Sequence, residues 1–441
     1  MASRTPVEKG VGWLYDQVTG EEDARVCKDI PDEACSDQPR NFFAYLLANF
    51  FNKISDELVS ARLTLPWLFG VLGVPAAFVG FLVPIREAGV LLPQLVVAAY
   101  VRSMRKRKVV WLIGALLSAA ALVLMALVGW QSTGALAGWL LLVCLIFYSL
   151  ARGLCSVSAK DVLGKTVSKT RRGRLMGYTA SLAGVATVAI GLLLQTDVIS
   201  QDSLSVLLWF VIVAALFWIL ALTSFAFIAE PPGATEGGGN ALEEAIRSLR
   251  LIIDDKPFQQ YVVSRILFLS VALVIPFYVL FVQQQIEGQL ALLGWLIIAN
   301  GLASSLSAPM IGRLADSNSR NVMAGAALLA GVVGVVTWYV SVYHNDMQWS
   351  GFSAVVLFFL ITLAHGAARL GRKVYLVDMA TQENRAQYVA VSNTVIGVAM
   401  LFGGVVGVIA DVFNAQAVIL LLSVIALTAS VYIKRLPDVS G

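Results

Sequence analysis

Charged side chains are scarce in this sequence. Asp, Glu, Lys and Arg make up 14% of its 441 residues, against about 25% in an ordinary soluble protein. Hydrophobic residues account for 58%, and the mean hydropathy is +0.78. This composition excludes a typical soluble domain and predicts an all-α polytopic membrane protein.

Residues that commonly build catalytic or metal sites are also few. The chain has two His and four Cys, and the cysteines show no C-x-x-C spacing. The sequence contains no His/Asp metal cluster, no Ser/His/Asp set and no glycine-rich nucleotide loop. We therefore expect no enzyme, no cofactor, no metal site and no nucleic-acid partner. We also expect Cys27, Cys35, Cys144 and Cys155 to be free thiols.

The first 40 residues lack the apolar core of about 7–15 residues that a signal peptide needs. The first spanning helix is therefore expected to insert itself, and residues 1–40 are expected to form a cytoplasmic segment. Within it, Val11, Trp13, Leu14 and Val18 lie at nearly helical spacing, which predicts a short helix on the membrane surface.

Beyond residue 40, apolar runs recur that are long enough to cross about 30 Å of hydrocarbon as helices. We count twelve, over 42–69, 76–101, 108–130, 136–158, 174–194, 204–229, 259–283, 289–311, 321–342, 350–371, 388–410 and 414–433. Lys and Arg are absent from every second connection and concentrated in the others. By the positive-inside rule, the basic connections and both termini are cytoplasmic. We expect a multi-pass protein of the bacterial inner membrane.

The chain divides into two similar halves. A Pro/Gly-rich stretch from Pro231 to Gly239, followed by an amphipathic segment to Asp255, separates the sixth and seventh spans. Residues 151–181 align with 364–394 at an offset of 213 residues, and the same offset aligns 107–109 with 320–322. We therefore predict two six-helix bundles related by a pseudo-two-fold axis. The predicted boundaries are a cytoplasmic segment 1–40, a bundle 41–230, a linker with an amphipathic helix 231–258, a bundle 259–435 and a tail 436–441.

Several short motifs resemble those of the major facilitator superfamily, over about residues 41–435. Gly312-Arg313-Leu314-Ala315-Asp316, followed by Arg320, is similar to the G-x-L-A-D-x-x-x-R segment between the second and third helices of each half. Further matches are Ser55-Asp56, Arg152-Gly153 and Arg172-Gly173-Arg174 in or near the first, fourth and fifth helices. The resemblance implies a permease with a cytoplasmic gating loop at Gly312, Asp316 and Arg320. It also implies a link between Arg152 and proton coupling.

Two departures from the family pattern leave the subfamily unassigned. The first half reads Ala99 to Ser103 at the gating position, without the Gly and the Asp. The fifth span lacks the Gly-Pro pair that marks drug/proton antiporters.

A cluster of charged residues lies inside the first span, between Lys53 and Arg62. Charges at such depth cost at least about 2–3 kcal/mol each, so by default they mark a functional site. Counting outward from the turn near residue 73 places Glu57, Arg86 and Glu87 within about one helical turn of the same depth. Asp56 shares a helix face with Lys53.

Two interpretations of this cluster stay open. In the first, a carboxylate of Asp56 or Glu57 alternates between a proton and a salt bridge with a nearby Arg. One of Arg86 and Glu87 then pairs with Asp56 or Glu57, and the other faces the central cavity. In the second, Lys53 with Glu57, and Arg86 with an acid, are static pairs that hold the first two helices together. Lys53 and Arg62 are also long enough to extend towards the membrane interfaces.

The second half has fewer such residues, namely Arg265, Asn300, His365 and Arg369. Arginines facing a central cavity would favour an anionic or zwitterionic solute. The alternatives are a cytoplasmic-end anchor for Arg369 and a hydrogen-bonded core position for His365. The glycines of the eleventh span, Gly397, Gly403, Gly404 and Gly407, predict close helix packing.

The expected function is secondary active transport of a small organic solute, coupled to protons, by a monomer in the lipid bilayer that works by alternating access. The alternative is a non-transporting scaffold, or an assembly or lipid-interacting factor, on the same fold. Charges inside the spans favour transport, because a scaffold has little reason to retain them. The sequence predicts neither the identity of the solute nor the direction of its movement.

Overall fold

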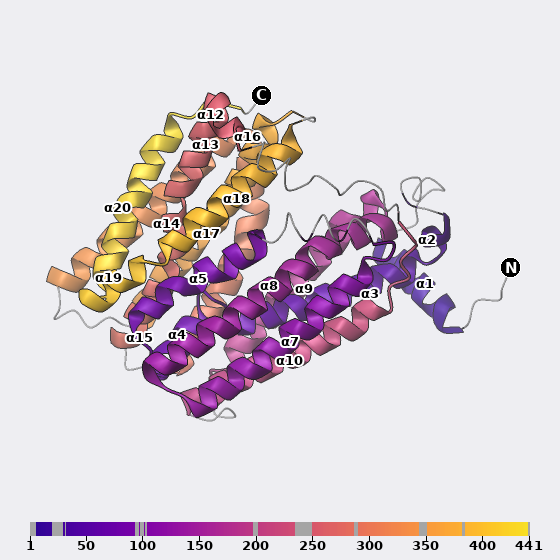
Figure 1. Ribbon diagram of the computed structural model, residues 1–441, viewed down its shortest axis with the longest axis horizontal. Coiled ribbons are helices and arrows are strands. Elements are labelled where there is room, and N and C mark those ends of the chain that lie inside the picture. Colours follow the sequence, from indigo (N-terminus) through magenta and orange to yellow (C-terminus); the bar gives the residue numbers. More distant parts are fainter. Residues whose placement is uncertain are drawn as a thin grey trace.

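The computed structural model describes residues 6–19, 30, 32–92, 97, 101, 104–196, 202–233, 249–285, 290–343, 351–381 and 384–439. Every regular element within these residues is a helix (Figure 1). Nine helices of the described chain are long and apolar enough to cross a membrane. The predicted all-α, multi-pass architecture is therefore confirmed at this level.

The first part of the chain forms a group of helices that pack along one another (Figure 1). They are α1 (Pro6–Thr19), α2 (Asp32–Ser36), α3 (Gln38–Leu58), α4 (Thr64–Val71), α5 (Ala76–Leu91), α7 (Lys108–Gln131), α8 (Gly134–Thr166), α9 (Lys169–Leu193) and α10 (Ser203–Ala226). The predicted N-terminal helix is α1. Its Trp13 side chain is 65% exposed, whereas Tyr15 is buried against the rest of the group.

The second part forms a similar group. Its helices are α12 (Leu251–Asp254), α13 (Lys256–Leu267), α14 (Leu269–Leu273), α15 (Ile275–Gln285), α16 (Leu290–Tyr343), α17 (Gly351–Met379), α18 (Arg385–Gly403), α19 (Val406–Val412) and α20 (Ala415–Lys434). The helices α8 and α17 end at Thr166 and Met379, which are separated by the 213-residue offset of the sequence repeat. Both helices extend beyond the predicted ends at 158 and 371.

The first predicted span, 42–69, is not one continuous helix. It is interrupted between Leu58, the last residue of α3, and Thr64, the first of α4. Pro66 explains the break, because its nitrogen cannot donate to the carbonyl of Arg62 and its ring would collide with that carbonyl in a continuous helix. The hydroxyl of Thr64 donates instead to the carbonyl oxygen of Glu57, at 3.2 Å.

The segment that resembles the family's gating loop is largely helical. Gly312 and Asp316 lie on α16, which continues without a break until Asn318. Asn318 has an extended backbone, and its side-chain oxygen accepts a hydrogen bond from the backbone N–H of Asn321 at 2.8 Å. Asn318 therefore caps the helix that follows, so the change of direction comes later than the sequence predicts.

Some predictions fall on other parts of the chain. Most of the amphipathic linker from Ala241, most of the segment Ala99 to Ser103, and Cys27 lie outside the described residues.

The expectation of four free thiols is wrong for Cys35, which is disulfide-bonded. Spacing rules detect local motifs and not cysteines that folding brings together. Cys144 and Cys155 are free and buried.

The two groups of helices approach each other closely at one end, where the connections carry no Lys or Arg. A Cβ atom on Gly80 of α5 would lie 2.5 Å from the carbonyl oxygen of Gly404 and 2.6 Å from the Cα of Gly407. A Cβ on Gly191 of α9 would lie 2.8 Å from the Gly294 carbonyl oxygen. The predicted close packing of the eleventh span's glycines is confirmed by these contacts.

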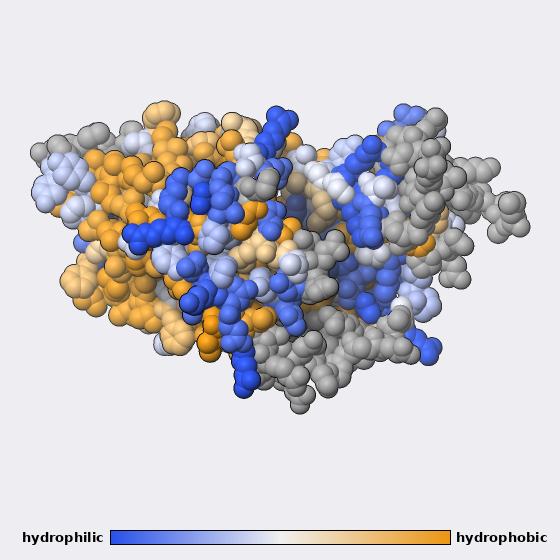
Figure 2. Space-filling view, turned by 90° about the horizontal axis from the view of Figure 1, so that it is seen from above, coloured by the Kyte–Doolittle hydropathy of each residue, from blue (hydrophilic) through white to orange (hydrophobic). Residues whose placement is uncertain are grey.

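The ribbons diverge towards the opposite end, where α2 and α12 lie (Figure 1). Viewed from above, hydrophilic side chains gather over the middle of this face, and hydrophobic ones lie mainly on its left side (Figure 2).

Gly80 offers a test of the tight contact between the groups. Leu at this position must separate α5 from α19, at an overpacking cost of about 1–3 kcal/mol. We expect the equilibrium to shift towards opening of this end by about fivefold or more. The measurement is the rate at which a membrane-impermeant maleimide labels a cysteine introduced at Gln283, in a variant without native cysteines.

Gly325→Leu is the matched control for Gly80→Leu, because nothing lies within 4 Å of a Cβ built on Gly325. Equal labelling rates in the two variants would show that the contact does not hold this end closed.

Candidate coupling and substrate site

Asp56 and Glu57 lie in the last turn of α3, beside the break in the first span. The C-terminal end of a helix carries a partial negative charge, so two carboxylates there are unfavourable without nearby cations. The fold supplies these cations from neighbouring helices. The break thus concentrates charge at one depth in the protein.

Asp56 is bound by two arginines and a tyrosine from two other helices. Arg86 of α5 donates to Oδ1 at 2.9 Å, and Arg152 of α8 donates to Oδ2 at 2.5 Å. The hydroxyl of Tyr148 also donates to Oδ1, at 2.9 Å. Of the two candidates on α5, Arg86 is therefore the one that pairs with an acid of α3. Arg152, which sequence reasoning linked to coupling only by resemblance, binds the same carboxylate.

Aromatic rings position the two arginines. The guanidinium carbon of Arg86 lies 5.2 Å from the centre of the Tyr148 ring, and that of Arg152 lies 4.9 Å from the Trp218 ring. The Trp218 indole N–H donates to the Tyr148 hydroxyl at 3.3 Å. Sequence reasoning missed both aromatic residues. Tyr148 could have been found, because it precedes Arg152 by one helical turn and so shares its face.

Glu87 forms a second pair, with Arg62 at 2.5 Å. The sequence analysis allowed Arg62 to extend towards a membrane interface. In the structure it lies in the break between α3 and α4 and pairs with a residue of α5. The side chains of Arg62 and Glu87 remain 28% and 38% exposed although both lie between helices. This pair is therefore only partly enclosed by the helices around it.

Glu57 differs from the other two acids because its hydrogen-bond partner is a neutral residue of the second group. The Asn300 amide of α16 donates to its Oε2 at 2.9 Å. Among described residues, no Lys or Arg nitrogen lies within ion-pairing distance of Glu57, so the predicted static pair with Lys53 is not formed. Lys53, Arg62 and Arg369 still lie close enough to interact with it electrostatically.

Cations of the second group face the site without a carboxylate partner among the described residues. Arg369 and Arg372 of α17 interact electrostatically with Glu87. His365, one turn before Arg369, is half-buried and lies near Arg62 and both of these arginines, not in the hydrogen-bonded core position considered above. Sequence reasoning had left Arg372 in a cytoplasmic connection, although it follows Arg369 by three residues and could have been placed on its face.

Arg265 occupies a separate position in the second group. It is 6% exposed, donates to the Ser392 hydroxyl at 2.8 Å and to the Asn393 side-chain oxygen at 3.4 Å, and packs over the Tyr261 ring. Its Nε has no hydrogen-bond partner in the described part of the protein. Arg265 also lies close enough to Arg372 to repel its charge.

The predicted gating residues are not held together. Arg320 donates to the carbonyl oxygen of Leu436 at 2.9 Å and pairs with Asp438 at 2.8 Å, so it holds the segment after α20. Gly312 and Asp316 lie on α16 outside this contact, and the Asp316 side chain is exposed and pairs with no described cation.

An equivalent contact in the first group is made by Glu230, which follows α10. It accepts from the backbone N–H groups of Arg107 and Lys108, at 3.0 and 2.7 Å, and from Lys165 at 2.9 Å. In each group, a carboxylate after the last helix holds the chain between the second and third spans. Sequence reasoning did not identify Glu230 or Asp438 for this role.

Comparison with known proteins agrees with this architecture. The sequence profile of the Major Facilitator Superfamily matches residues 42–278 and 261–440. The chain therefore belongs to the Major Facilitator Superfamily and is a multi-pass membrane protein of the transporter class. No curated protein sequence matches the chain.

Several solved transporter structures share the fold at low sequence identity. A POT family transporter in complex with 5-aminolevulinic acid has a TM-score of 0.70 and 14% identity, covering 92% of this chain and 98% of its own. The nucleoside transporter NupG has a TM-score of 0.68 and 12% identity, covering 90% and 99%. The inward-open xylose transporter XylE from E. coli has a TM-score of 0.65 and 14% identity, covering 90% and 97%.

Proposed function

We propose that this protein is a secondary active transporter that moves a small organic solute across the bacterial inner membrane by alternating access, driven by protons. In this proposal the chain is a monomer with twelve spanning helices in two bundles, 41–230 and 259–435, joined by the linker 231–258. Both termini, the segment 1–40 and the tail 436–441 lie in the cytoplasm. Nine of these spans are the long apolar helices described above. The other three are the pair α3 and α4 taken together, the helix α5, and the first part of α16.

The observation that carries the proposal is the hydrogen bond from Asn300 to Glu57, which joins the two helix groups at a carboxylate. Protonation of Glu57 would leave no bound cation without its partner, whereas protonation of Asp56 would release both Arg86 and Arg152. Glu57 is therefore the proton carrier, and Asp56 is the fixed anion that organises the first group. Glu87 and Arg62 line the water-accessible path to them.

The solute is anionic or zwitterionic. Lys53, Arg369 and Arg372 place positive charge at the site, and none of them has a carboxylate partner among the described residues. A negatively charged group would complete their electrostatic environment. The POT family neighbour bound to 5-aminolevulinic acid, a compound with an amine and a carboxylate, is consistent with this class.

Thermal-shift screening of purified protein against acidic metabolites and amphiphiles would identify the solute. With the solute in hand, we expect Arg369→Gln to weaken its binding about tenfold, because a charge-assisted hydrogen bond contributes about 1.5–3 kcal/mol. Arg313→Gln, at an exposed position on α16, is the control and should bind as the wild type does. If Arg369→Gln binds the solute as tightly as the wild type, Arg369 does not contact the solute.

The second candidate function is a non-transporting scaffold, or an assembly or lipid-interacting factor. Proteoliposomes with an imposed pH gradient distinguish the two. Solute movement that depends on the gradient supports transport, whereas a protein that binds lipid or partner proteins but moves none of the screened solutes supports the scaffold. In the transporter, the contact of Arg320 with the segment after α20 is proposed to regulate opening of the cytoplasmic end.

A further inference from the structure

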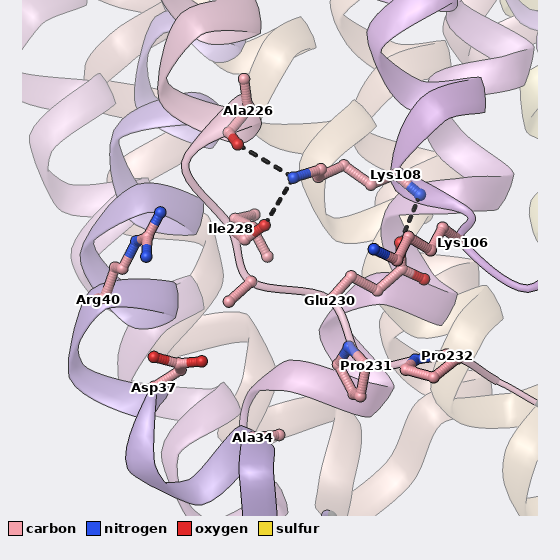
Figure 3. Close-up of a pocket in the computed structure, with 11 residues that line it drawn as sticks. Ala34, Asp37, Arg40, Lys106, Lys108, Ala226, Ile228, Glu230, Pro231 and Pro232 are labelled. Carbon is pink, nitrogen blue, oxygen red and sulfur yellow. Dashed lines mark hydrogen bonds between the residues drawn. The ribbon is translucent and has the colours of Figure 1, made fainter. Parts of the chain in front are cut away.

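A pocket with a volume of about 410 Å³ lies at the start of α3, far from the site at the end of that helix. Figure 3 shows Asp37 and Arg40 on one side of it and Lys106 and Lys108 on the other, with the chain from Ala226 to Pro232 between them. Arg40 precedes Asp56 by 16 residues, or about 24 Å along the helix. The volume lies within the range of about 300–1,000 Å³ that is common for ligand pockets.

Of the two acids that line this pocket, Glu230 is neutralised by groups of the protein. Glu230 is 7% exposed, and its carboxylate is satisfied by Lys165 and by two backbone N–H groups. The Lys108 ammonium donates to the carbonyl oxygens of Ala226 and Ile228, at 3.0 and 2.8 Å. Because both acceptors are neutral, Lys108 leaves positive charge in the pocket.

Two further cations face the same space. Arg40 and Lys106 have exposed side chains and form no ion pair with any described residue, Asp37 included. Both lie close enough to Lys108 to repel its charge. Three neighbouring cations with one free carboxylate favour the binding of an anion between them.

The position of the pocket selects the kind of anion. Lys108 begins α7 and Ala226 ends α10, and both helices are long and apolar enough to span the membrane. Val109 and Phe227 are next in sequence to the lining residues Lys108 and Ala226, and they are 43% and 63% exposed. Exposed apolar residues next to a basic pocket at the end of spanning helices are suited to a lipid, whose charged headgroup and acyl chains need both surfaces.

We propose that this pocket binds the phosphate group of an anionic phospholipid through Arg40 and Lys106, with the acyl chains lying along Val109 and Phe227. The site is independent of the transport site and would order the start of α3 against α10. Lys108 supplies charge but stays bound to the α10 carbonyl groups.

The test is native mass spectrometry of the full-length protein in detergent, titrated with phosphatidylglycerol, phosphatidylcholine or inorganic phosphate. We expect the wild type to retain phosphatidylglycerol preferentially, and the double variant R40Q/K106Q to bind it about tenfold more weakly. The control R313Q/R435Q removes the same charge from exposed positions outside the pocket and should bind as the wild type does. The single variants R40Q and K106Q, each expected to weaken binding about threefold, serve if the double variant does not elute as a single species.

Three outcomes would overturn the proposal. Equal affinity of R40Q/K106Q and the wild type for phosphatidylglycerol would exclude these residues. Equal retention of phosphatidylcholine would show that the pocket does not select negative charge. Displacement of the lipid by inorganic phosphate at the same concentration would assign the pocket to a free anion instead.

Discussion

Replacing Asp56 with Asn is expected to abolish transport and to destabilise the protein by about 3 kcal/mol. The substitution leaves the guanidinium groups of Arg86 and Arg152 without their shared carboxylate, and loss of one partner from a buried ion pair commonly costs about 3–5 kcal/mol. The lower end applies because these side chains are 16–27% exposed. The measurements are the melting temperature in detergent and solute uptake into proteoliposomes.

A double variant separates the effect on stability from the effect on transport. In Asp56→Asn combined with Arg152→Gln, one surplus cation is removed, so part of the lost stability should return while transport stays absent. Asp56→Glu retains the charge and should keep more of the melting temperature than Asp56→Asn. If Asp56→Asn melts like the wild type, Asp56 does not organise the first group.

Glu57→Gln should separate solute movement from proton coupling. Gln keeps an oxygen that can accept from Asn300 and has nearly the same volume, so the fold should remain intact. Because the side chain can no longer bind and release a proton, accumulation driven by a pH gradient should fall at least about tenfold, the scale of a positioned proton-transfer group. Exchange of labelled for unlabelled solute at equal concentrations should continue.

Asn300→Ala is the companion variant, since it removes the amide while retaining the carboxylate. It should still respond to pH, although with altered affinity. If Glu57→Gln accumulates solute at the wild-type level, Glu57 is not the proton carrier. Either another group carries the proton, or transport is not coupled to protons.

The sequence predicted the large-scale architecture because hydropathy and charge act over whole helices. Each apolar run must satisfy its own backbone in the membrane, so helix formation follows from length and composition. The last residues of α8 and α17 are also separated by 213 residues, the offset of the sequence repeat. Counting residues from the turn near residue 73 also placed Arg86 at the depth of the α3 acids. This works because two antiparallel helices joined by a short turn rise by the same distance per residue from that turn.

The details of the site depended on contacts that no single helix specifies. Pairing of Arg152 with Asp56 requires α8 to pack beside α3, and the bond from Asn300 to Glu57 requires the two groups to meet. The break in the first span is different, since Pro66 was visible in the sequence and its consequence for Arg62 could have been predicted. The alternative of a static pair between Lys53 and Glu57 is not formed, because i, i+4 spacing permits a pair without requiring one.

The contacts at the closely packed end determine how the molecule can change shape. The side-chain hydrogen bonds that cross between the groups, within the described chain, come from three amides: Gln195 to Ala291, Gln283 to Trp67, and Asn300 to Glu57. An ordinary hydrogen bond contributes only about 0.5–1.5 kcal/mol, because water can replace the lost partner. The carboxylates after α10 and α20, by contrast, make their bonds inside one group each. The side-chain hydrogen bonds between the groups are therefore weaker than the ion pairs inside each group and can be exchanged for bonds to water. Among them, only the one to Glu57 involves a group that can bind a proton.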